Sequence, residues 1–409
     1  MNMPGTGERP ERDAQEKLSV AVRECPLRIL FIFPQVWDPC KTNFSGQFTM
    51  LPESVSGHIF TLSSRQQPVV KLGRFLLRWK EIGASTWQGL WNGLVARWWL
   101  PIWYLKRGEV DVVIAYDPYA CGLAGVFLKW VLGARLIVQM NGDFHEYPPS
   151  SSVIKNAIMK MVFSLSMRWA DAAKVLNSSQ AAYVRRLYPA LPVYQFHDYV
   201  ACEFFEATPT TQGTHVLFIG HPFHLKGVDI LVKAFLLIAD RHPLVSLRIM
   251  GYSPEPELSV YQALAGHHPR IEFLKPGWME AVRDQLKDCY ALVNVTRTEA
   301  LGRVFIEAMS CGKPIVASDT NGARICVEDG RTGFIVRQED PDDCARQLDR
   351  LLSDPALAAR MGQAARARAR ALFSEASYER CFMQMTREVM AGRTGRAAAS
   401  PSAPTLPTA

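Results

Sequence analysis

Residues 296–336 read TRTEALGRVFIEAMSCGKPIVASDTNGARICVEDGRTGFIV and place two carboxylates, Glu299 and Glu307, around the expected start of a helix. The apolar run YALVNV at 290–295 predicts a short strand just before it. Residues 303–310 are helix formers, and the sequence Gly-Lys-Pro follows soon after them as a stop signal. Glu299 is therefore expected in a strand-to-helix loop, and Glu307 about one turn inside the helix.

The start of this helix has the chemistry of a sugar-nucleotide site. A helix N-terminus offers N–H groups without partners and a partial positive charge, so the turn at Leu301, Gly302 and Arg303 suits a diphosphate. Carboxylates repel phosphate, but they accept hydrogen bonds from the hydroxyl groups of ribose and hexose. The alternative is that Glu299 and Glu307 are ordinary helix-start acids that the macrodipole favours, and for two isolated acids that alternative would prevail.

The motifs around the two glutamates shift that balance. They read EALG (299–302), EAMSCGKP (307–314), NG (321–322) and DGRTGF (329–334). In this order they resemble the large family of retaining GT-B glycosyltransferases, glycosyl transferases group 1, which is marked by a Glu, seven residues and a second Glu before a Gly-rich turn. The resemblance extends over about residues 27–390 and is strong in the second half only.

Short β-rich runs alternate with longer helical patterns along the chain. The runs lie at 27–33, 111–116, 135–140, 215–220, 246–250, 290–295 and 314–318. This alternation predicts parallel sheets with helices on both faces. Together with the resemblance it implies an α/β protein of two Rossmann-like, doubly wound domains that face a central cleft, the GT-B type. A chain of 409 residues has the length for two such domains.

The expected domain boundaries follow from composition and from the resemblance. An acceptor-side domain is expected at 26–207 and a nucleotide-sugar-binding domain at 208–373, with the linker ATPTTQGT where they join. By the same resemblance a helix at 374–391 crosses back to the first domain. The polar segment 1–25 and the Ala-, Pro- and Ser-rich segment 392–409 are expected to be disordered.

The resemblance assigns the donor site and two catalytic residues, Glu299 and Lys226. Glu299 would hold the hydroxyls of the donor sugar and Glu307 those of the ribose, while Lys226 and the helix start would stabilise the departing diphosphate. The other donor-binding residues are Gly220, His221, Leu301, Gly302 and Arg303. The family usually carries arginine where this chain has His221, and imidazole grips phosphate only when it is protonated. We hypothesise that Arg303 supplies the missing charge; a solvated surface turn around Lys226 is the alternative.

The acceptor side departs from the family. Its Gly-rich loop after the first strand corresponds to residues 42–47, where Gly46 fits and a second glycine does not. The histidine that the family has at the end of a later strand is Asn141 here, which cannot act as an acid or a base. Its role would be lost or would pass to Asp143 or His145; the alternative is that these are loop residues that cap the next turn.

No metal or other cofactor is expected beside the nucleotide-sugar co-substrate. The one Asp-x-Asp match, Asp340-Pro341-Asp342, is a spacing that binds Mn²⁺ in other glycosyltransferases. Because Asp343 and a helical pattern follow it, it is better explained as an N-cap cluster with proline in the first turn. The nine cysteines contain no Cys-x-x-Cys pair, which argues against a zinc site and a disulfide framework. Most are expected to be buried thiols in a reducing cytosol.

Basic residues and tryptophans concentrate in residues 65–107. Eight basic residues stand there against one acid, Glu81, and six of the ten tryptophans lie there. A membrane interface favours this combination, so the segment predicts peripheral binding to an anionic membrane surface through a helical pattern. The lipid-facing positions of that pattern are Val70, Phe75, Leu76, Trp79 and Ile82. The alternative is that the aromatics form a core behind a solvated basic face. Nucleic acid is not expected as a partner, since no binding motif accompanies the charge.

The favoured function is a retaining, nucleotide-sugar-dependent hexosyltransferase that acts on a glycan or lipid-linked acceptor in bacterial surface polysaccharide or exopolysaccharide biosynthesis. The second is a catalytically weak member that binds sugar nucleotide or glycan, motivated by His221 and Asn141. A glycan phosphorylase of the same fold would need a lysine for pyridoxal phosphate, which no motif marks. Without a signal-peptide pattern or an apolar run of about 18 residues, the expected location is the cytoplasm, peripheral at the cytoplasmic face of the inner membrane. The nucleotide, the sugar, the linkage and the oligomeric state stay open.

Overall fold

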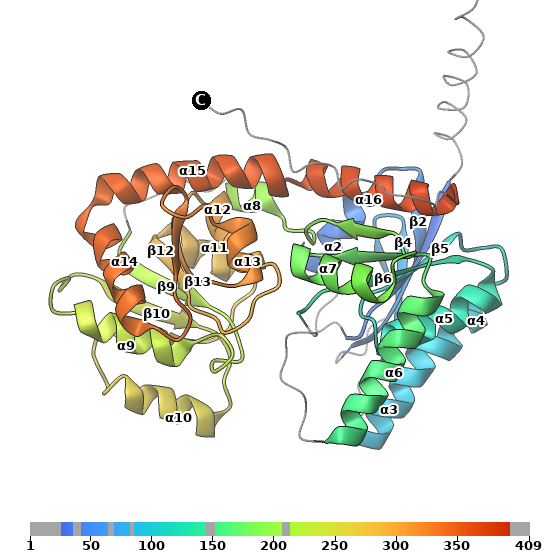
Figure 1. Ribbon diagram of the computed structural model, residues 1–409, viewed down its shortest axis with the longest axis horizontal. Coiled ribbons are helices and arrows are strands. Elements are labelled where there is room, and N and C mark those ends of the chain that lie inside the picture. The colour runs from blue at the N-terminus through green and yellow to red at the C-terminus, as the bar shows by residue number, and fades with distance from the viewer. Residues whose placement is uncertain are drawn as a thin grey trace, which may run out of the picture.

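The computed structural model describes residues 26–35, 42–63, 69–81, 86–143, 152–206 and 213–392. They form two lobes, each built on its own sheet (Figure 1). The first lobe comprises the described residues up to Glu206 together with the last helix, and the second lobe comprises residues 213–373. The two segments expected to be disordered (apart from Gly392), most of the linker, and Arg65, Ile82 and His145 lie outside the described residues.

The first lobe contains an eight-stranded sheet in the order β3-β4-β2-β1-β5-β6-β7-β8. Its strands are β1 (Leu27–Ile32), β2 (Val55–Ser63), β3 (Val70–Leu72), β4 (Phe75–Glu81), β5 (Val112–Ala115), β6 (Arg135–Met140), β7 (Ala172–Val175) and β8 (Val193–Gln195). Neighbouring strands pair in parallel, except that β3 and β4 are antiparallel. The strand order of this sheet reverses between β1 and β5, so the sheet is doubly wound.

The helical pattern expected over residues 70–82 is wrong. The segment forms β3 and β4, and β4 extends the sheet beside β2. Phe75 and Leu77 alternate along β4 as fully buried core residues, while Lys80 is exposed. The apolar residues of this segment therefore pack into the core, as the alternative interpretation held.

Helices cover both faces of the first sheet (Figure 1). They are α2 (Thr42–Thr49), α3 (Thr86–Leu94), the π-helical segment η1 (Val95–Trp99), α4 (Leu100–Tyr104), α5 (Ala120–Leu132), α6 (Val153–Trp169), α7 (Ser178–Leu187) and α8 (Cys202–Glu206). The interval 42–47, expected as a Gly-rich loop, lies in α2 instead. Gly46 is a packing residue there, because a Cβ at this position would lie 2.4 Å from the hydroxyl oxygen of Tyr199.

The second lobe contains a parallel six-stranded sheet in the order β11-β10-β9-β12-β13-β14. Its strands are β9 (His215–Ile219), β10 (Ser246–Met250), β11 (Ile271–Leu274), β12 (Cys289–Asn294), β13 (Ile315–Ser318) and β14 (Gly333–Val336). The strand order reverses between β9 and β12, and in doubly wound sheets ligands bind beyond the carboxyl ends of the strands at such a point. The expected α/β fold of two doubly wound domains is confirmed.

Helices also flank the second sheet. They are α9 (Val228–Ile238), α10 (Glu255–Leu264), α11 (Met279–Lys287), α12 (Arg303–Ser310), α13 (Asn321–Cys326), α14 (Pro341–Ser353) and α15 (Pro355–Phe373). Asp340 caps α14, since its side chain accepts a hydrogen bond from Asp343 N (2.8 Å), so the capping interpretation of the Asp-x-Asp match is confirmed. The seven described cysteines are free and six of them are buried, whereas Cys25 and Cys40 lie outside the described residues.

The last helix, α16 (Glu375–Met390), lies on the first lobe, whereas α15 just before it lies on the second (Figure 1). Ser374 separates the two helices and caps α16 through a hydrogen bond from Ser377 N. Phe382 in α16 stacks on Phe31 of β1, with ring centroids 6.1 Å apart. Tyr194 donates a hydrogen bond to Glu388 (2.8 Å) farther along the same helix. The end of the chain thus completes the core of the lobe in which the described chain begins.

Candidate active site

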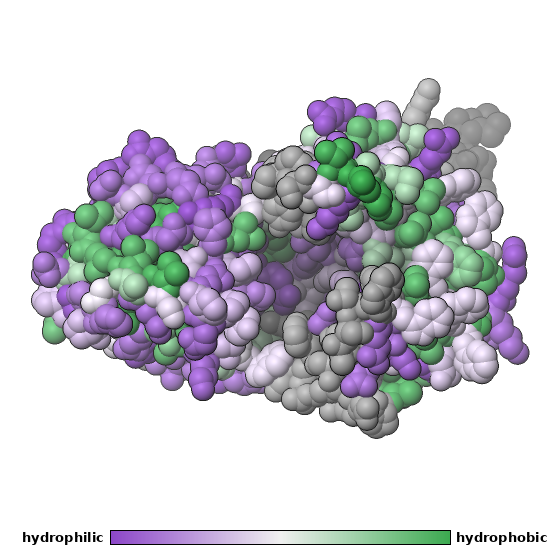
Figure 2. Space-filling model, turned by 90° about the horizontal axis from the view of Figure 1, so that it is seen from below, coloured by the Kyte–Doolittle hydropathy of each residue, from purple (hydrophilic) through white to green (hydrophobic). Residues whose placement is uncertain are grey.

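A pocket of about 450 Å³ lies between the two lobes. Asn141, Leu176 and Asp198 line it from the first lobe, and the loops that follow β9 and β12 line it from the second. Figure 2 shows the molecule hollowed between its lobes, with mostly hydrophilic side chains around the hollow. The pocket lies beyond the carboxyl ends of β9 and β12, where the strand order reverses.

Asn294 joins the ends of these two strands at the pocket. Its side-chain amide donates to Ile219 O (3.0 Å) and its oxygen accepts from Ile219 N (3.4 Å). Asn294 is 1% exposed, so both hydrogen bonds are shielded from water. Asn294 is not among the site residues predicted from the sequence, although a polar side chain near the end of the apolar run YALVNV marks the strand end.

Lys226 and Glu299 meet in the pocket as an ion pair, with Lys226 Nζ 2.7 Å from Glu299 Oε2. Lys226 lies in the loop between β9 and α9, and Glu299 lies in the loop between β12 and α12. Gly227 lets the first loop approach the backbone after β12 closely, since it has φ +73° and a Cβ there would lie 2.0 Å from Val295 O. The backbones of the two loops therefore pack closely against each other, and the two charged side chains meet next to this contact.

The start of α12 opens into the same pocket. Gly302 precedes the helix with φ +78°, and no side chain caps the helix at this residue. Glu299 Oε1 accepts a hydrogen bond from Gly302 N (3.1 Å), which holds the carboxylate beside the helix start. Gly322 N donates to Glu299 O (2.7 Å) from the start of α13. The N-terminus of α12 thus presents its positive end to the pocket next to a carboxylate that is fixed at both oxygens.

The remaining residues expected at the donor site line the same pocket. They are Gly220, His221, Leu301, Gly302, Arg303 and Glu307. Glu307 is 7% exposed inside α12, whereas His221 and Arg303 are exposed at the rim. The pocket therefore gathers two cationic side chains, an imidazole and two carboxylates on the second lobe, a set suited to a phosphorylated, hydroxyl-rich ligand.

The three residues expected on the acceptor side are not gathered in one place. Asn141 lines the pocket, but Gly46 and Asp143 are not among its lining residues. Asp143 is 1% exposed, and its carboxylate accepts hydrogen bonds from the amides of Asn177 (2.8 Å), Gln180 (2.8 Å) and Asn321 (3.0 Å). Because Asn321 belongs to the second lobe, Asp143 ties the lobes together beside the pocket.

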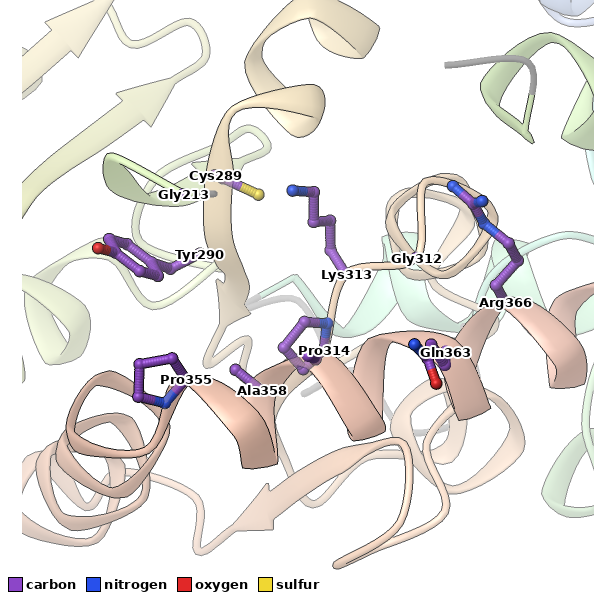
Figure 3. Close-up of a pocket in the computed structure, with 11 residues that line it drawn as sticks. Gly213, Cys289, Tyr290, Gly312, Lys313, Pro314, Pro355, Ala358, Gln363 and Arg366 are labelled. Atoms are coloured by element: carbon purple, nitrogen blue, oxygen red, sulfur yellow. The ribbon is translucent and has the colours of Figure 1, made fainter. Parts of the chain in front are cut away.

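A second pocket, of about 370 Å³, lies at the opposite ends of the strands of the second lobe. It is lined by residues that include Cys289 at the start of β12, Lys313 and Arg366. In Figure 3 the ammonium of Lys313 points toward the sulfur of Cys289. Burial raises the pKa of the Cys289 thiol to about 12, so this sulfur stays protonated at neutral pH. Arg366 Nε is committed to Ser310 O (3.1 Å) at the end of α12. This pocket contains none of the paired acids and bases that the pocket between the lobes holds.

Metal-binding clusters are absent from the part of the chain that the structure describes: no three His, Cys, Asp or Glu side chains are grouped so that they could hold an ion.

The sequence of the second lobe matches known proteins. Residues 203–368 match the family model described as glycosyl transferases group 1. The chain is 33% identical over 159 residues to a D-inositol 3-phosphate glycosyltransferase of Streptomyces avermitilis, which covers 36% of this chain and 34% of that protein. It is 33% identical over 170 residues to the enzyme of that name from Corynebacterium jeikeium, covering 40% of this chain and 41% of that one. The match to the first of these spans about a third of the relative's length.

Solved structures share the fold over most of the chain. Sucrose-phosphate synthase from Thermosynechococcus elongatus superposes with a TM-score of 0.74 at 20% identity, covering 89% of this chain and 99% of that one. HepE of Anabaena, solved in complex with UDP-glucose, superposes with a TM-score of 0.68 at 17% identity, covering 88% and 99%. Both lobes and their arrangement therefore recur in these proteins.

Proposed function

The second lobe of this chain matches the family model described as glycosyl transferases group 1, and on that premise we propose that the protein moves a sugar from a nucleotide-sugar donor to a glycan or lipid-linked acceptor. The observation that supports this most is the pair of Lys226 and Glu299 beside the start of α12, with Glu307 in the same pocket. The solved complexes of HepE with UDP and UDP-glucose show that a protein of this fold binds such a donor.

The proposed reaction retains the anomeric configuration. The bond from the anomeric carbon to the diphosphate oxygen breaks, the acceptor oxygen bonds to that carbon, and the acceptor proton leaves on the diphosphate. Lys226 and the N-terminus of α12 stabilise the charge that grows on the leaving group. Glu299, held by Lys226 and Gly302 N, accepts from the sugar hydroxyls, and Glu307 accepts from the ribose. No divalent metal takes part, because these groups carry the positive charge that the diphosphate requires.

The donor site can be tested by thermal shift. We expect UDP-, GDP-, ADP- or dTDP-sugars of one nucleotide class to raise the Tm by about 5 °C with EDTA present, since a ligand near 100 times its Kd stabilises by about 2.7 kcal/mol. Glu307→Ala is expected to lose this shift, whereas Glu280→Ala, an exposed acid on α11, keeps it. A shift that appears only with Mn²⁺ or Mg²⁺ would contradict the metal-free site.

A second candidate function follows from the acceptor side. Asn141 takes the place where the family carries a histidine, and Asp143 is fully engaged by three amides. A protein that binds the donor but turns over no acceptor would be a sugar-nucleotide-binding subunit. Donor-induced stabilisation without any sugar transfer would favour this candidate.

We propose further that the first lobe docks on an anionic membrane surface, as a step in surface polysaccharide or exopolysaccharide assembly at the cytoplasmic face of the inner membrane. Large apolar side chains stand exposed on α3, η1, α4 and α6. Trp103 is 83% exposed, and Val153 and Ile154, in the first turn of α6, are 81% and 73% exposed. Other exposed residues of this surface are Trp91, Leu94, Trp99, Trp130, Ile158, Met161, Leu165 and Trp169. α5 lies between these helices, since Trp130 packs on Trp169 (5.5 Å) and Trp98 on Phe127 (5.1 Å).

The charge of these helices agrees with that partner. The segments 86–104, 120–132 and 153–169 contain no aspartate or glutamate. They carry five bases, Arg97, Lys129, Lys155, Lys160 and Arg168. Apolar surface without acids and with scattered bases suits lipid headgroups of negative charge. Within the described residues no helix is both long and apolar enough to cross a bilayer.

Vesicle sedimentation tests this contact. We expect the protein to sediment with anionic vesicles of phosphatidylglycerol and less with neutral phosphatidylcholine. The triple variant Val153→Ser, Ile154→Ser, Ile158→Ser is expected to bind these vesicles at least about 10-fold more weakly, because it removes apolar area that the lipid would bury. The control is a matched triple variant on the second lobe, Leu237→Ser, Leu244→Ser, Val260→Ser. It replaces exposed apolar residues of similar size and should leave vesicle binding unchanged. Equal binding to both vesicle types would overturn the proposal.

A further inference from the structure

The first-lobe wall of the pocket between the lobes carries a carboxylate, that of Asp198. Asn141, Leu176 and Asp198 supply this wall. Asp198 lies in the loop after β8, and its side chain is 14% exposed. The cations of the pocket, Lys226 and Arg303, belong to the second lobe. The second-lobe wall thus combines cations with two carboxylates, whereas the charged group of the first-lobe wall is the carboxylate of Asp198.

Asp198 is fixed in place by its neighbours. Lys174 on β7 is 1% exposed and forms an ion pair with Asp198 Oδ1. His197 Nδ1–H donates a hydrogen bond to the backbone oxygen of Asp198 (2.8 Å). Burial lowers the pKa of His197 to about 4, so its ring is neutral at physiological pH and adds no charge to the wall. The carboxylate is therefore anchored through one oxygen, and the exposed part of the side chain faces the pocket.

Asn141 adds a second hydrogen-bond acceptor to this wall. Its amide nitrogen donates to Tyr116 O (3.1 Å), and since a carbonyl oxygen can only accept, this bond fixes the orientation of the side chain. Its Oδ1 is buried and has no hydrogen-bond partner in the described part of the chain. A buried acceptor of this kind is costly until a donor reaches it.

Two acceptors on one wall select for a particular ligand chemistry. Hydroxyl groups can donate to a carboxylate and to an amide oxygen at once, as neighbouring hydroxyls of a sugar or polyol do. An ionised phosphate group offers only acceptor oxygens, so neither the free oxygen of Asp198 nor Asn141 Oδ1 could form a hydrogen bond with it. The wall therefore favours a neutral, hydroxyl-rich group and disfavours a phosphorylated one.

We propose that Asp198 and Asn141 bind the reacting end of the acceptor, and that this end is a neutral sugar or polyol with no phosphate next to the attacking hydroxyl. The proposal rests on the proposed function. Asp198 accepts a hydrogen bond from the attacking hydroxyl and orients its oxygen toward the anomeric carbon. The bond from that carbon to the diphosphate breaks, the new glycosidic bond forms, and the hydroxyl proton passes to an oxygen of the leaving diphosphate. Asn141 Oδ1 accepts from a neighbouring hydroxyl, and Lys174 is a positioning residue that acts through Asp198.

Transfer assays with paired acceptors test the proposal. The donor is the nucleotide sugar that stabilises the wild type, and the acceptors are methyl glycosides of glucose, galactose, mannose and N-acetylglucosamine beside the 6-phosphates of the same sugars. We expect the wild type to use a neutral glycoside and to reject its phosphorylated counterpart. Asp198→Asn should lower transfer to the neutral glycoside about 100-fold, because orientation of the hydroxyl is lost, while the donor-induced Tm shift stays. Asp240→Asn, an exposed acid of the second lobe, is the matched control.

The role of Lys174 is separated from a merely structural one by the kinetic constants. Lys174→Met is expected to raise the KM for the acceptor and to leave the KM for the donor unchanged. In the double variant Lys174→Met, Asp198→Asn we expect transfer no lower than in Asp198→Asn alone, because both changes remove the same interaction. The double variant also avoids a buried carboxylate without a partner, so it serves as the folded control for Lys174→Met.

The outcomes distinguish this proposal from the function on which it rests. A wild type that transfers to phosphorylated sugars as well as to neutral ones overturns the acceptor assignment, and so does an Asp198→Asn protein that loses the donor-induced shift. A wild type that no nucleotide sugar stabilises contradicts the proposed function itself, before any acceptor is added.

Discussion

Lys226→Ala is expected to lower kcat by about 100- to 1000-fold with the fold intact, the range found when one preorganised donor to a developing negative charge is removed. Lys226 lines the pocket beside the start of α12, and its ammonium contacts Glu299 Oε2 (2.7 Å). Its loss removes the positive charge that stabilises the leaving group, and it leaves the carboxylate that is proposed to hold the sugar without its ion-pair partner. Lys226 and Glu299 are 19% and 16% exposed, so the variant leaves a largely shielded carboxylate without its cation, and some loss of stability is expected beside the loss of activity.

The measurement is steady-state transfer with the stabilising nucleotide sugar, beside circular dichroism to show that the variant is folded. Lys233→Ala removes an exposed lysine from α9, the helix that follows Lys226, and is expected to keep wild-type rates. Arg303→Ala tests whether this arginine compensates for the histidine at position 221. If donor affinity is unchanged in Arg303→Ala and abolished in Lys226→Ala, the compensation hypothesis fails. A Lys226→Ala enzyme with wild-type kcat would remove Lys226 from the mechanism.

Phe382→Ala is expected to lower the free energy of unfolding by about 3 to 5 kcal/mol, because it deletes a buried aromatic ring from a packed core. Phe382 is 1% exposed and lies between Phe31 of β1 (6.1 Å) and Tyr378 one turn back along α16 (5.9 Å). The ring belongs to the last described helix, but the cavity would open in the core of the first lobe.

Urea unfolding followed by tryptophan fluorescence measures this effect on the first lobe, since nine of the ten tryptophans precede residue 170 and only Trp278 follows. Gln384→Ala changes an exposed position of the same helix and is the control, with an expected cost of a few tenths of a kcal/mol. A loss below about 1 kcal/mol in Phe382→Ala would mean that α16 is not part of the core of the first lobe.

Local patterns predicted the second lobe better than the first. The helix expected at 303–310 is α12 with the same bounds, because a strand, a glycine turn and a run of helix formers follow one another along the chain. For residues 70–81 the sequence predicts a helix where the structure has strands, because the apolar side chains of these short strands also fit a helical spacing. Only the pairing with β2, which is distant in sequence, decides which of the two forms.

Contacts between separate elements also explain why some site residues were not predicted from the sequence. Asp198 follows no motif, and its place in the pocket depends on Lys174, 24 residues earlier on another strand. The exposed apolar side of α6 was missed for a related reason. Its sequence shows which residues are apolar, but burial of Phe163 and exposure of Ile154 are decided by the sheet against which the helix packs. Contacts of this kind depend on how the helices and strands pack, and the spacing of residues along the sequence does not reveal them.

The return of α16 to the first lobe sets the order in which the chain can mature during its synthesis. Translation delivers about 5 to 20 residues per second, so roughly 10 to 40 s pass between the emergence of Glu206 and that of α16. During that time the site on β1 that Phe382 will cover stays open to water, and all the strands of the second lobe emerge before α16 does. The lobe made first on the ribosome is therefore the last to be finished.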